Sequence, residues 1–182
     1  MPAEMLRWAS ALLMAPVAVA ASACATRPVT PSSISESRSF VVERDLVGKS
    51  VGRGVFKSLV GPDRAFTAYL DGSWDGQTLT LVEDFEFDDG EKDRKTWRLT
   101  RQADGTFVGT REDVVGEARG YHDGDAFRLE YLVDFPKDGG GATRVGFRDV
   151  LILREDGAIF NKATVGWRGL RVGGVELVIE RR

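Results

Sequence analysis

Apolar and polar residues alternate along most of the chain after residue 40, and this period of two is typical of β-strands with one buried face. The clearest case is the stretch from Gln77 to Phe87, where one face carries Leu79, Leu81, Phe85 and Phe87. Glu83 is the acidic residue that interrupts this apolar face. No long window keeps a helical period, so we expect little helix.

The dipeptide Asp-Gly occurs seven times, beginning at Asp71, Asp75, Asp89, Asp104, Asp123, Asp138 and Asp156. Asp-Gly between alternating segments is a strong signal for a hairpin turn, because glycine adopts positive φ without strain. Gly173-Gly174 predicts one further hairpin near the C-terminus. The pattern therefore predicts strands over residues 40–46, 51–60, 64–70, 77–87, 92–101, 106–112, 118–122, 126–135, 143–154, 158–164, 167–172 and 175–181.

A meander of this length leaves two unpaired edges unless it curls and closes on itself. We therefore predict an all-β fold, in which an antiparallel meander closes into a lipocalin-like (calycin-like) up-and-down β-barrel. With roughly ten strands, the interior can exceed what side chains alone fill. Charged residues such as Arg94, Arg98 and Glu130 are too frequent for a lipid-facing surface, so a transmembrane barrel is disfavoured.

The turn at Asp89 tests the register of the central hairpin. A two-residue loop of Asp89-Gly90 would mix charged and apolar residues on one face, whereas a three-residue loop over 88–90 keeps one face apolar. The three-residue loop pairs Leu79 with Leu99, Leu81 with Trp97, and Glu83 with Lys95. We therefore predict an ion pair between Glu83 and Lys95, at the inner face or at a mouth of the barrel.

A three-residue loop over 155–157 gives the same kind of result in a second hairpin. It pairs Leu153 with Ile159 and Leu151 with Asn161, and it places Asp149 on the apolar face. Polar groups on such faces can orient a ligand in a cavity. The alternatives are satisfied structural pairs or strand ends near solvent. Trp74 and Trp97 are likewise either core packing or an aromatic wall for a ligand.

The sequence lacks the motifs of several common metal-binding, catalytic and nucleotide-binding sites. It has one histidine, His122, beside a turn, and one cysteine, so zinc sites of the Cys/His type and Cys–His catalysis are excluded. No nucleophile elbow or nucleotide-binding loop occurs. The acidic cluster at residues 88–93 fails the EF-hand pattern and fits turn chemistry. The net charge of −3, without a basic block, does not suggest nucleic-acid binding. We expect no metal and no cofactor.

The N-terminal residues indicate an envelope lipoprotein. Residues 1–23 have the layout of a signal peptide, with an apolar run too short for a comfortable membrane span. Cys24 follows Ala21-Ser22-Ala23 as in a bacterial lipobox, where the thiol is acylated, although a Leu is commoner at the position of Ala21. Residues 24–39 then form the lipidated cysteine and a flexible tether rich in Pro, Ser and Thr, and residues 40–182 form one barrel domain.

The alternatives at the N-terminus are an ordinary signal-peptidase site at Ala21-Ser22-Ala23, which would release a secreted or periplasmic protein, and an uncleaved anchor. Ala25 is not the Asp that often retains lipoproteins at the inner membrane of proteobacteria. We therefore expect the protein to be lipid-anchored at the periplasmic face of the outer membrane.

Several blocks of the sequence resemble an uncharacterised family of proteobacterial lipoproteins, domain-of-unknown-function family 3833. The blocks are Arg64–Phe66, Gly72–Gly76, Leu79–Leu81 with Glu83 and Phe85, Asp89–Glu91, Trp97, Asp113–Gly120, Gly124–Ala126, and Asn161–Ala163 with Gly166. Asp113–Gly120 is the most specific block. After Phe147 the family pattern has two acids and a Trp, of which this chain keeps only Asp149. The resemblance implies a lipocalin-like envelope lipoprotein, and it implies no reaction and no catalytic residues.

Together these observations predict a non-enzymatic envelope lipoprotein whose barrel binds a small apolar or amphipathic ligand such as a lipid. The candidate cavity residues are Trp74, Glu83, Lys95, Trp97, Asp113, Asp149 and Asn161. One alternative is a structural or interaction protein of the envelope with a packed barrel. Another is a carboxylate-based hydrolase, which needs two acids about 5–10 Å apart across a cleft.

Overall fold

The computed structural model describes residues 38–59, 61–136 and 140–182. The signal peptide, Cys24 and most of the tether predicted from the sequence lie outside these residues, as does the Asp-Gly pair at Asp138. No helix among the residues described is long and apolar enough to cross a membrane.

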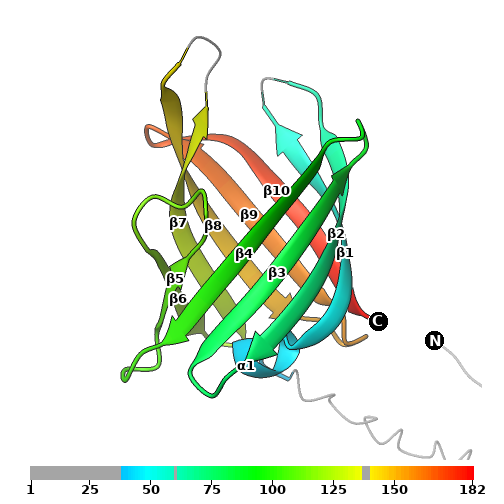
Figure 1. The fold of residues 1–182 in the computed structure, drawn as a ribbon, viewed down its shortest axis with the longest axis vertical. Coiled ribbons are helices and arrows are strands. Elements are labelled where there is room, and N and C mark those ends of the chain that lie inside the picture. Colours follow the sequence, from blue (N-terminus) through cyan, green and yellow to red (C-terminus); the bar gives the residue numbers. More distant parts are fainter. Residues whose placement is uncertain (1–37, 60, 137–139) are drawn as a thin grey trace, which may run out of the picture. The chain divides into compact units, whose positions relative to one another are not determined.

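Ten antiparallel strands form one closed barrel, in which each strand pairs with the next and β1 pairs with β10 (Figure 1). Every strand has a paired neighbour on both sides, so the predicted all-β barrel is confirmed. The strands are β1 (Gly48–Ser58), β2 (Arg64–Trp74), β3 (Thr78–Phe87), β4 (Lys92–Arg101), β5 (Phe107–Thr110), β6 (Ala118–Asp123), β7 (Ala126–Pro136), β8 (Ala142–Leu153), β9 (Ile159–Trp167) and β10 (Leu170–Arg181).

Most of the predicted turns are present, and the register of two hairpins is confirmed. Five Asp-Gly pairs place glycine at positive φ between strands, at Gly76, Gly90, Gly105, Gly124 and Gly157. The pairs Glu83–Lys95 and Leu151–Asn161 lie opposite each other, as predicted. The exception is Asp71-Gly72, which lies inside β2.

Gly72 serves close packing rather than a turn. A Cβ atom built at Gly72 would collide with the carbonyl oxygen of Leu46, which lies against this part of β2. Glycine is therefore needed in the strand because another segment of backbone approaches it.

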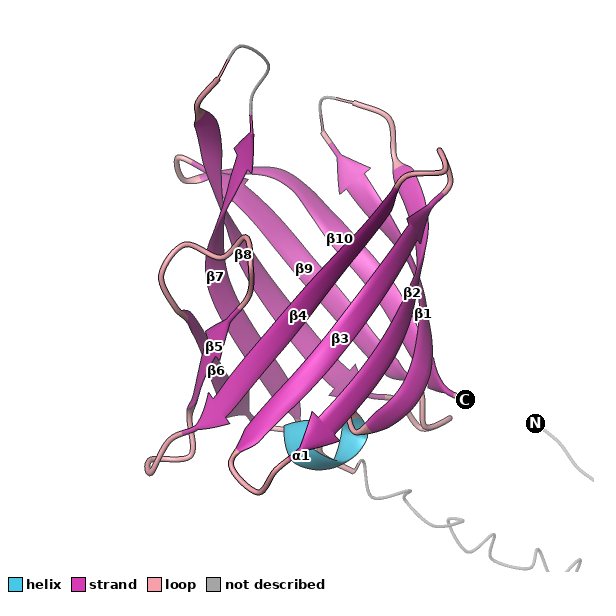
Figure 2. Ribbon diagram, in the orientation of Figure 1, coloured by secondary structure: helices cyan, strands magenta, loops and turns pink. Residues whose placement is uncertain are grey.

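The strand predicted over residues 40–46 is wrong, because this segment forms the short helix α1 (Val42–Asp45) across one end of the barrel (Figure 2). Phe40, Val42 and Leu46 are almost fully buried there. The pairing of β1 with β10 leaves no edge of β1 free for the preceding segment, and these residues bury their side chains by closing the end of the barrel. We call residues 38–46 the plug.

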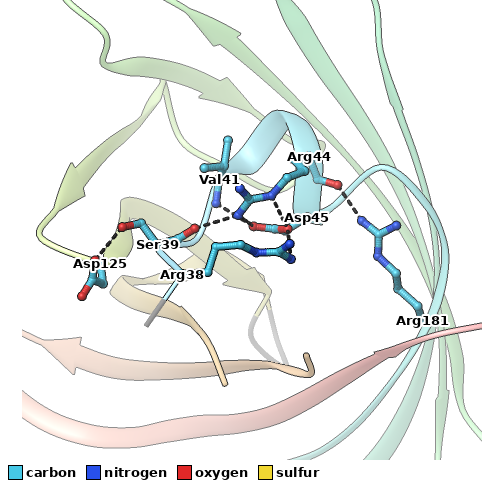
Figure 3. Close-up of polar contacts among 7 residues, drawn as sticks. All are labelled: Arg38, Ser39, Val41, Arg44, Asp45, Asp125 and Arg181. Carbon is cyan, nitrogen blue, oxygen red and sulfur yellow. Dashed lines mark hydrogen bonds and ion pairs between the residues drawn. The ribbon is translucent and has the colours of Figure 1, made fainter. Parts of the chain in front are cut away.

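A polar network holds the plug in place (Figure 3). The buried Asp45 carboxylate accepts a hydrogen bond from the Val41 backbone N–H at 2.8 Å and from the Arg44 guanidinium at 2.6 and 2.8 Å. Arg44 also donates to the Ser39 carbonyl, and Arg181 of β10 donates to the Arg44 carbonyl. The plug is thus bonded to itself and to the barrel.

The predicted strand over residues 167–172 and the hairpin at Gly173-Gly174 are also wrong. The last hairpin turns at Arg168-Gly169, where both residues have positive φ, and Gly173 and Gly174 lie within β10 beside a register shift. A Cβ at Gly173 would lie 2.6 Å from the Lys57 carbonyl oxygen, and one at Gly174 would lie 2.8 Å from that of Ala163. These glycines permit close strand contact rather than a turn.

Candidate functional site

The barrel encloses a cavity of about 510 Å³ that is lined by every strand from β1 to β4 and from β7 to β10. Its lining reaches from Leu46 of the plug to residues near the strand ends opposite the plug, such as Ser58 and Arg64. Most of its lining residues are aliphatic or aromatic. A cavity of this size and character is typical of a site for a small ligand.

Aromatic residues surround the part of the cavity farthest from the plug. Phe66 lies 5.7 Å from Phe85 and 5.8 Å from Phe87, measured between ring centroids. The Arg64 guanidinium lies 3.8 Å above the centre of the Phe87 ring. We call this end, which includes the connections at residues 88–91 and 168–169, the mouth.

Exposed apolar side chains gather at the mouth. Leu59 and Leu170 are 66% and 67% exposed, and Phe135 and Trp167 are also exposed. Phe135 also lines the cavity. The entrance to the cavity therefore carries apolar side chains beside charged residues such as Arg64 and Asp93.

Five polar side chains interrupt the apolar lining between the mouth and the plug, and we call them the polar belt. They are Glu83 of β3, Arg111 after β5, Tyr131 of β7, Asp149 of β8 and Asn161 of β9. All except Arg111 lie on strands, and strand alternation directs their side chains inward, because each belongs to a strand face whose other members are buried and apolar. The belt brings together Glu83, Asp149 and Asn161, which the sequence had placed on apolar faces.

Arg111 is the cation of the belt. Its Nε donates a hydrogen bond to the Asp113 carboxylate at 2.7 Å, and its side chain is 12% exposed. The guanidinium also lies 4.7 Å from the centre of the Trp97 ring and 5.2 Å from that of Tyr131. Asp113 therefore positions Arg111 from outside the cavity lining, while two aromatic rings hold it from within.

Asp149 is a buried acid with two polar neighbours. Burial raises its pKa to about 6, against the opposing effect of hydrogen bonding from Tyr131 and Asn161 and of the Arg111 charge. Burial and the nearby Asp149 charge in turn raise the pKa of the Tyr131 hydroxyl well above its usual range. The Tyr131 hydroxyl therefore stays protonated and able to donate near neutral pH.

Glu83 differs from Asp149 because it has no hydrogen-bond or ion-pair partner among the residues described. It is only 9% exposed, and burial raises its pKa to about 7, although the Arg111 charge opposes the shift. Near neutral pH this carboxyl group is therefore present in both protonation states. An unpartnered carboxyl group facing a cavity is a candidate contact for a ligand.

The predicted ion pair between Glu83 and Lys95 is not formed, although the two residues lie opposite each other. The Lys95 ammonium instead lies 3.0 Å from Asp93 and 3.7 Å from Asp113. Its long, flexible side chain reaches these more exposed carboxylates, where less solvation is lost. Lys95 still lines the cavity on the side of the mouth.

The two tryptophan candidates fall in different places. Trp97 is buried in the cavity lining, in edge-to-face contact with Tyr131 at 5.0 Å. Trp74, at the end of β2 near the plug, packs against the core and is absent from the lining. Asp113 is also outside the lining and acts through Arg111.

Sequence reasoning missed Arg111 and Tyr131. Tyr131 was hidden because a tyrosine on an apolar strand face looks like ordinary core. Arg111 follows the end of β5 and precedes an irregular segment, so strand alternation could not place it. The available signal was its position two residues before Asp113, in a chain region with a specific family block.

The described residues contain no group of three His, Cys, Asp or Glu side chains placed to hold a metal ion. His122 is exposed beside its turn and is not part of the cavity lining. It contacts the rings of Phe107 and Phe127. The chemistry that the cavity offers is therefore that of carboxyl, guanidinium, phenol and amide groups within an apolar enclosure.

Comparison with known proteins identifies a family and related folds. The family model described as "Protein of unknown function (DUF3833)" matches residues 18–181. The crystal structure of Rv2717c from M. tuberculosis is 18% identical with a TM-score of 0.53, over 76% of this chain and 94% of that chain. The S-type phycobiliprotein lyase CPES from Guillardia theta is 9% identical with a TM-score of 0.53, over 74% and 86%. Both structures share the lipocalin-like barrel fold, and no curated protein matches the sequence.

Proposed function

This chain belongs to the DUF3833 family of proteins of unknown function, and we propose that it is a non-enzymatic binding protein for a small apolar or amphipathic ligand such as a lipid. The observation that carries the proposal is the cavity of about 510 Å³, whose apolar lining is interrupted by the polar belt. Such a lining suits a molecule with an apolar body and a polar group.

The size of the cavity favours binding over the alternative of a packed barrel with a purely structural role. A packed interior would leave voids no larger than a water molecule, which occupies about 30 Å³ in the liquid. Phe66, Phe85 and Phe87 also turn apolar ring surface toward this space. Ligand burial would give that surface a stabilising contact.

A hydrolase remains the second candidate, because Glu83 and Asp149 are both acids with raised pKa values in one cavity. Similar pairs act in glycoside hydrolysis. The binding function is favoured because Arg111 and Tyr131 are held in contacts with Asp113, Trp97 and Asp149. One similar structure is that of a lyase, but at 9% identity none of its residues carries over.

We further propose that the protein acts in the cell envelope, anchored by acylation of Cys24. A lipid anchor would hold the barrel near the membrane, where an apolar ligand is available. Labelling with an alkyne fatty acid tests this: wild type is expected to carry label and to partition with membranes. A Cys24→Ser variant is expected to lose both, and equal labelling of the two would reject the anchor.

Native mass spectrometry on residues 38–182 purified from the periplasm tests ligand binding directly. A discrete adduct of lipid size, lost on organic extraction, is expected. Binding of a neutral fluorescent probe, N-phenyl-1-naphthylamine, provides a second readout. A bare mass from repeated preparations together with no probe binding would overturn the binding function and favour the structural role.

A further inference from the structure

We propose that the cavity prefers amphiphiles whose polar group is a hydrogen-bond donor with positive charge, such as a primary alkylammonium, over anionic amphiphiles such as fatty acids. This inference rests on the proposed binding function, because it takes the ligand's apolar body to lie in the cavity. It adds the chemistry of the polar group, which the shape of the cavity does not define.

The polar belt contains acceptors that lack donors. The Glu83 carboxyl group faces the cavity, is nine-tenths buried, and has no hydrogen-bond or ion-pair partner among the residues described. The buried Oδ1 atom of Asn161, on β9 in the same lining, also has no hydrogen-bond partner in the described part of the chain. Buried polar groups without partners are costly, so a ligand that donates hydrogen bonds to them would be stabilised.

Most donors of the belt already have acceptors, and the exceptions are N–H groups of Arg111, such as those of Nη1, which have no acceptor among the residues described. Arg111 donates to Asp113 through Nε at 2.7 Å and through Nη2 at 3.3 Å. The Tyr131 hydroxyl and the Asn161 amide group interact with Asp149. A fatty-acid carboxylate would therefore have to compete with Asp149 for the Tyr131 and Asn161 donors and with Asp113 for part of the Arg111 guanidinium.

The charge balance also disfavours an anion. Glu83, Asp149 and Asp113 can carry three negative charges beside the single positive charge of Arg111. The balance stays negative when Glu83 is protonated. Lys95 and its partner Asp93 add one charge of each sign and leave the balance unchanged. In an interior of low dielectric, this excess attracts a cation and repels an anion.

Because Glu83 can be protonated, the proposal also predicts how ligand affinity changes with pH. The charged groups that act on Glu83 are Arg111, Asp149, Asp113 and Glu112. An ammonium group binds best when Glu83 and Asp149 are ionised, so its affinity is expected to rise between pH 5.5 and 8, and the part of the rise that Glu83 causes should be missing in Glu83→Gln. The affinity of a neutral alcohol should not rise in that range.

The test compares three ten-carbon ligands on residues 38–182: decylammonium, 1-decanol and decanoate, each displacing N-phenyl-1-naphthylamine below its micelle concentration. At pH 7.5 we expect decylammonium to bind at least about 10-fold more tightly than decanoate. In Glu83→Gln the ratio of ammonium to alcohol affinity should fall toward one. Glu86→Gln, the same change outside the cavity on the same strand, should keep the wild-type ratio.

The outcomes separate the two proposals. No displacement by any ligand, and no probe binding, would overturn the proposed function itself. Displacement by decanoate as strong as by decylammonium would overturn the present inference and leave the binding function standing. An unchanged ammonium-to-alcohol ratio in a folded Glu83→Gln variant would do the same.

Discussion

Folding disfavours the ionised form of Glu83, because it buries the carboxyl group of this residue. Burial raises its pKa to about 7 from the ordinary 4.5, so the folded protein binds a proton that the unfolded chain has released at pH 5–6. Stability contributed by this proton is complete below about pH 4.5 and is lost as the pH rises to about 7. Two other buried acids also contribute: Asp45, whose pKa is lowered, acts in the opposite direction, and Asp149, whose pKa is raised, acts in the same direction. A difference between wild type and a Glu83 variant is therefore needed to isolate the contribution of Glu83.

Glu83→Gln is expected to stabilise the unliganded domain in a pH-dependent way. Below pH 4.5 the two proteins should have nearly equal free energies of unfolding, because Glu83 is then neutral in both states. Above pH 7 the variant should be more stable by about 3 kcal/mol, from a pKa difference of about 2.5 units at about 1.4 kcal/mol each. Urea unfolding between pH 4 and 8 measures the difference.

The matched control is Glu86→Gln, on the same strand but in an ion pair with Lys92 at the outer surface. Lys92 lowers the pKa of Glu86, so this variant should lose a little stability at neutral pH rather than gain it. A flat difference between Glu83→Gln and wild type across the pH range would contradict the buried, unpartnered state of Glu83.

Asp45 is also a buried acid, but its pKa is lowered, whereas that of Glu83 is raised. Burial alone would raise its pKa, but hydrogen bonds from Arg44 and from the Val41 N–H outweigh burial and lower it. Asp45→Asn is therefore expected to cost about 1–3 kcal/mol at pH 7, because Arg44 loses its charged partner. The cost should shrink as the pH falls below about 3.8, where the unfolded chain begins to protonate Asp45, and it should disappear only below the lowered pKa of Asp45 in the folded protein.

Chemical denaturation at pH 7 and at about pH 2.5 measures this cost, with Asp71→Asn as the control. Asp71 is paired with Lys49 at 4.0 Å in an exposed position, and such pairs contribute little. An Asp45→Asn cost that is the same at both pH values would show that the charge has no role in holding the plug.

At the residue scale, the sequence could place Glu83, Asp149 and Asn161 on the inner face because strand period and turn length determine which way a side chain points. It could not place the partner of Lys95, since a flexible side chain chooses among several carboxylates only in three dimensions. It also could not show that Asp113 holds Arg111, because that contact lies outside the regular strands.

At the scale of elements, the plug accounts for the wrongly predicted strand over residues 40–46 and for the need for glycine at Gly72. Alternation at residues 40–46 is compatible with a strand, and only closure of the sheet by β1 and β10 excludes one. The Phe40 N–H then bonds the Asp125 carbonyl at 3.0 Å, and the Phe40 ring lies 6.2 Å from that of Phe127. Local pattern predicted hairpins well because their turns depend on neighbouring residues, whereas the plug depends on the finished barrel.

Gly72→Ala tests the contact between the plug and β2. The added Cβ would collide with the Leu46 backbone, which cannot move without displacing the plug. We expect a loss of about 1–3 kcal/mol in the free energy of unfolding, as for other overpacked sites. Gly146→Ala on β8 is the control, because its Cβ would meet nothing closer than 3.6 Å. Equal effects of the two substitutions would contradict the close approach.

At the scale of the whole molecule, the plug closes one end of the barrel, and aromatic residues surround the cavity at the other end, the mouth. The sequence could predict the closed barrel from the number of hairpins and the need to remove sheet edges. Whether the interior was filled or hollow depends on how all ten strands tilt and which side chains meet. That property belongs to the assembled barrel, which is why the sequence left both possibilities open.

Filling the cavity should abolish the stabilisation that a ligand provides. A ligand bound only by the folded state at 100 times its Kd adds about 2.7 kcal/mol, which raises the Tm of a domain of this size by roughly 5–10 °C. Ala163→Phe on β9 would put a ring into the cavity, whereas Thr164→Phe adds the same ring on the outer face. Thermal unfolding with and without decylammonium should therefore show the shift in wild type and Thr164→Phe, and not in Ala163→Phe. A full shift in Ala163→Phe would mean that the ligand binds on the surface of the barrel, and the cavity would lose its assigned role.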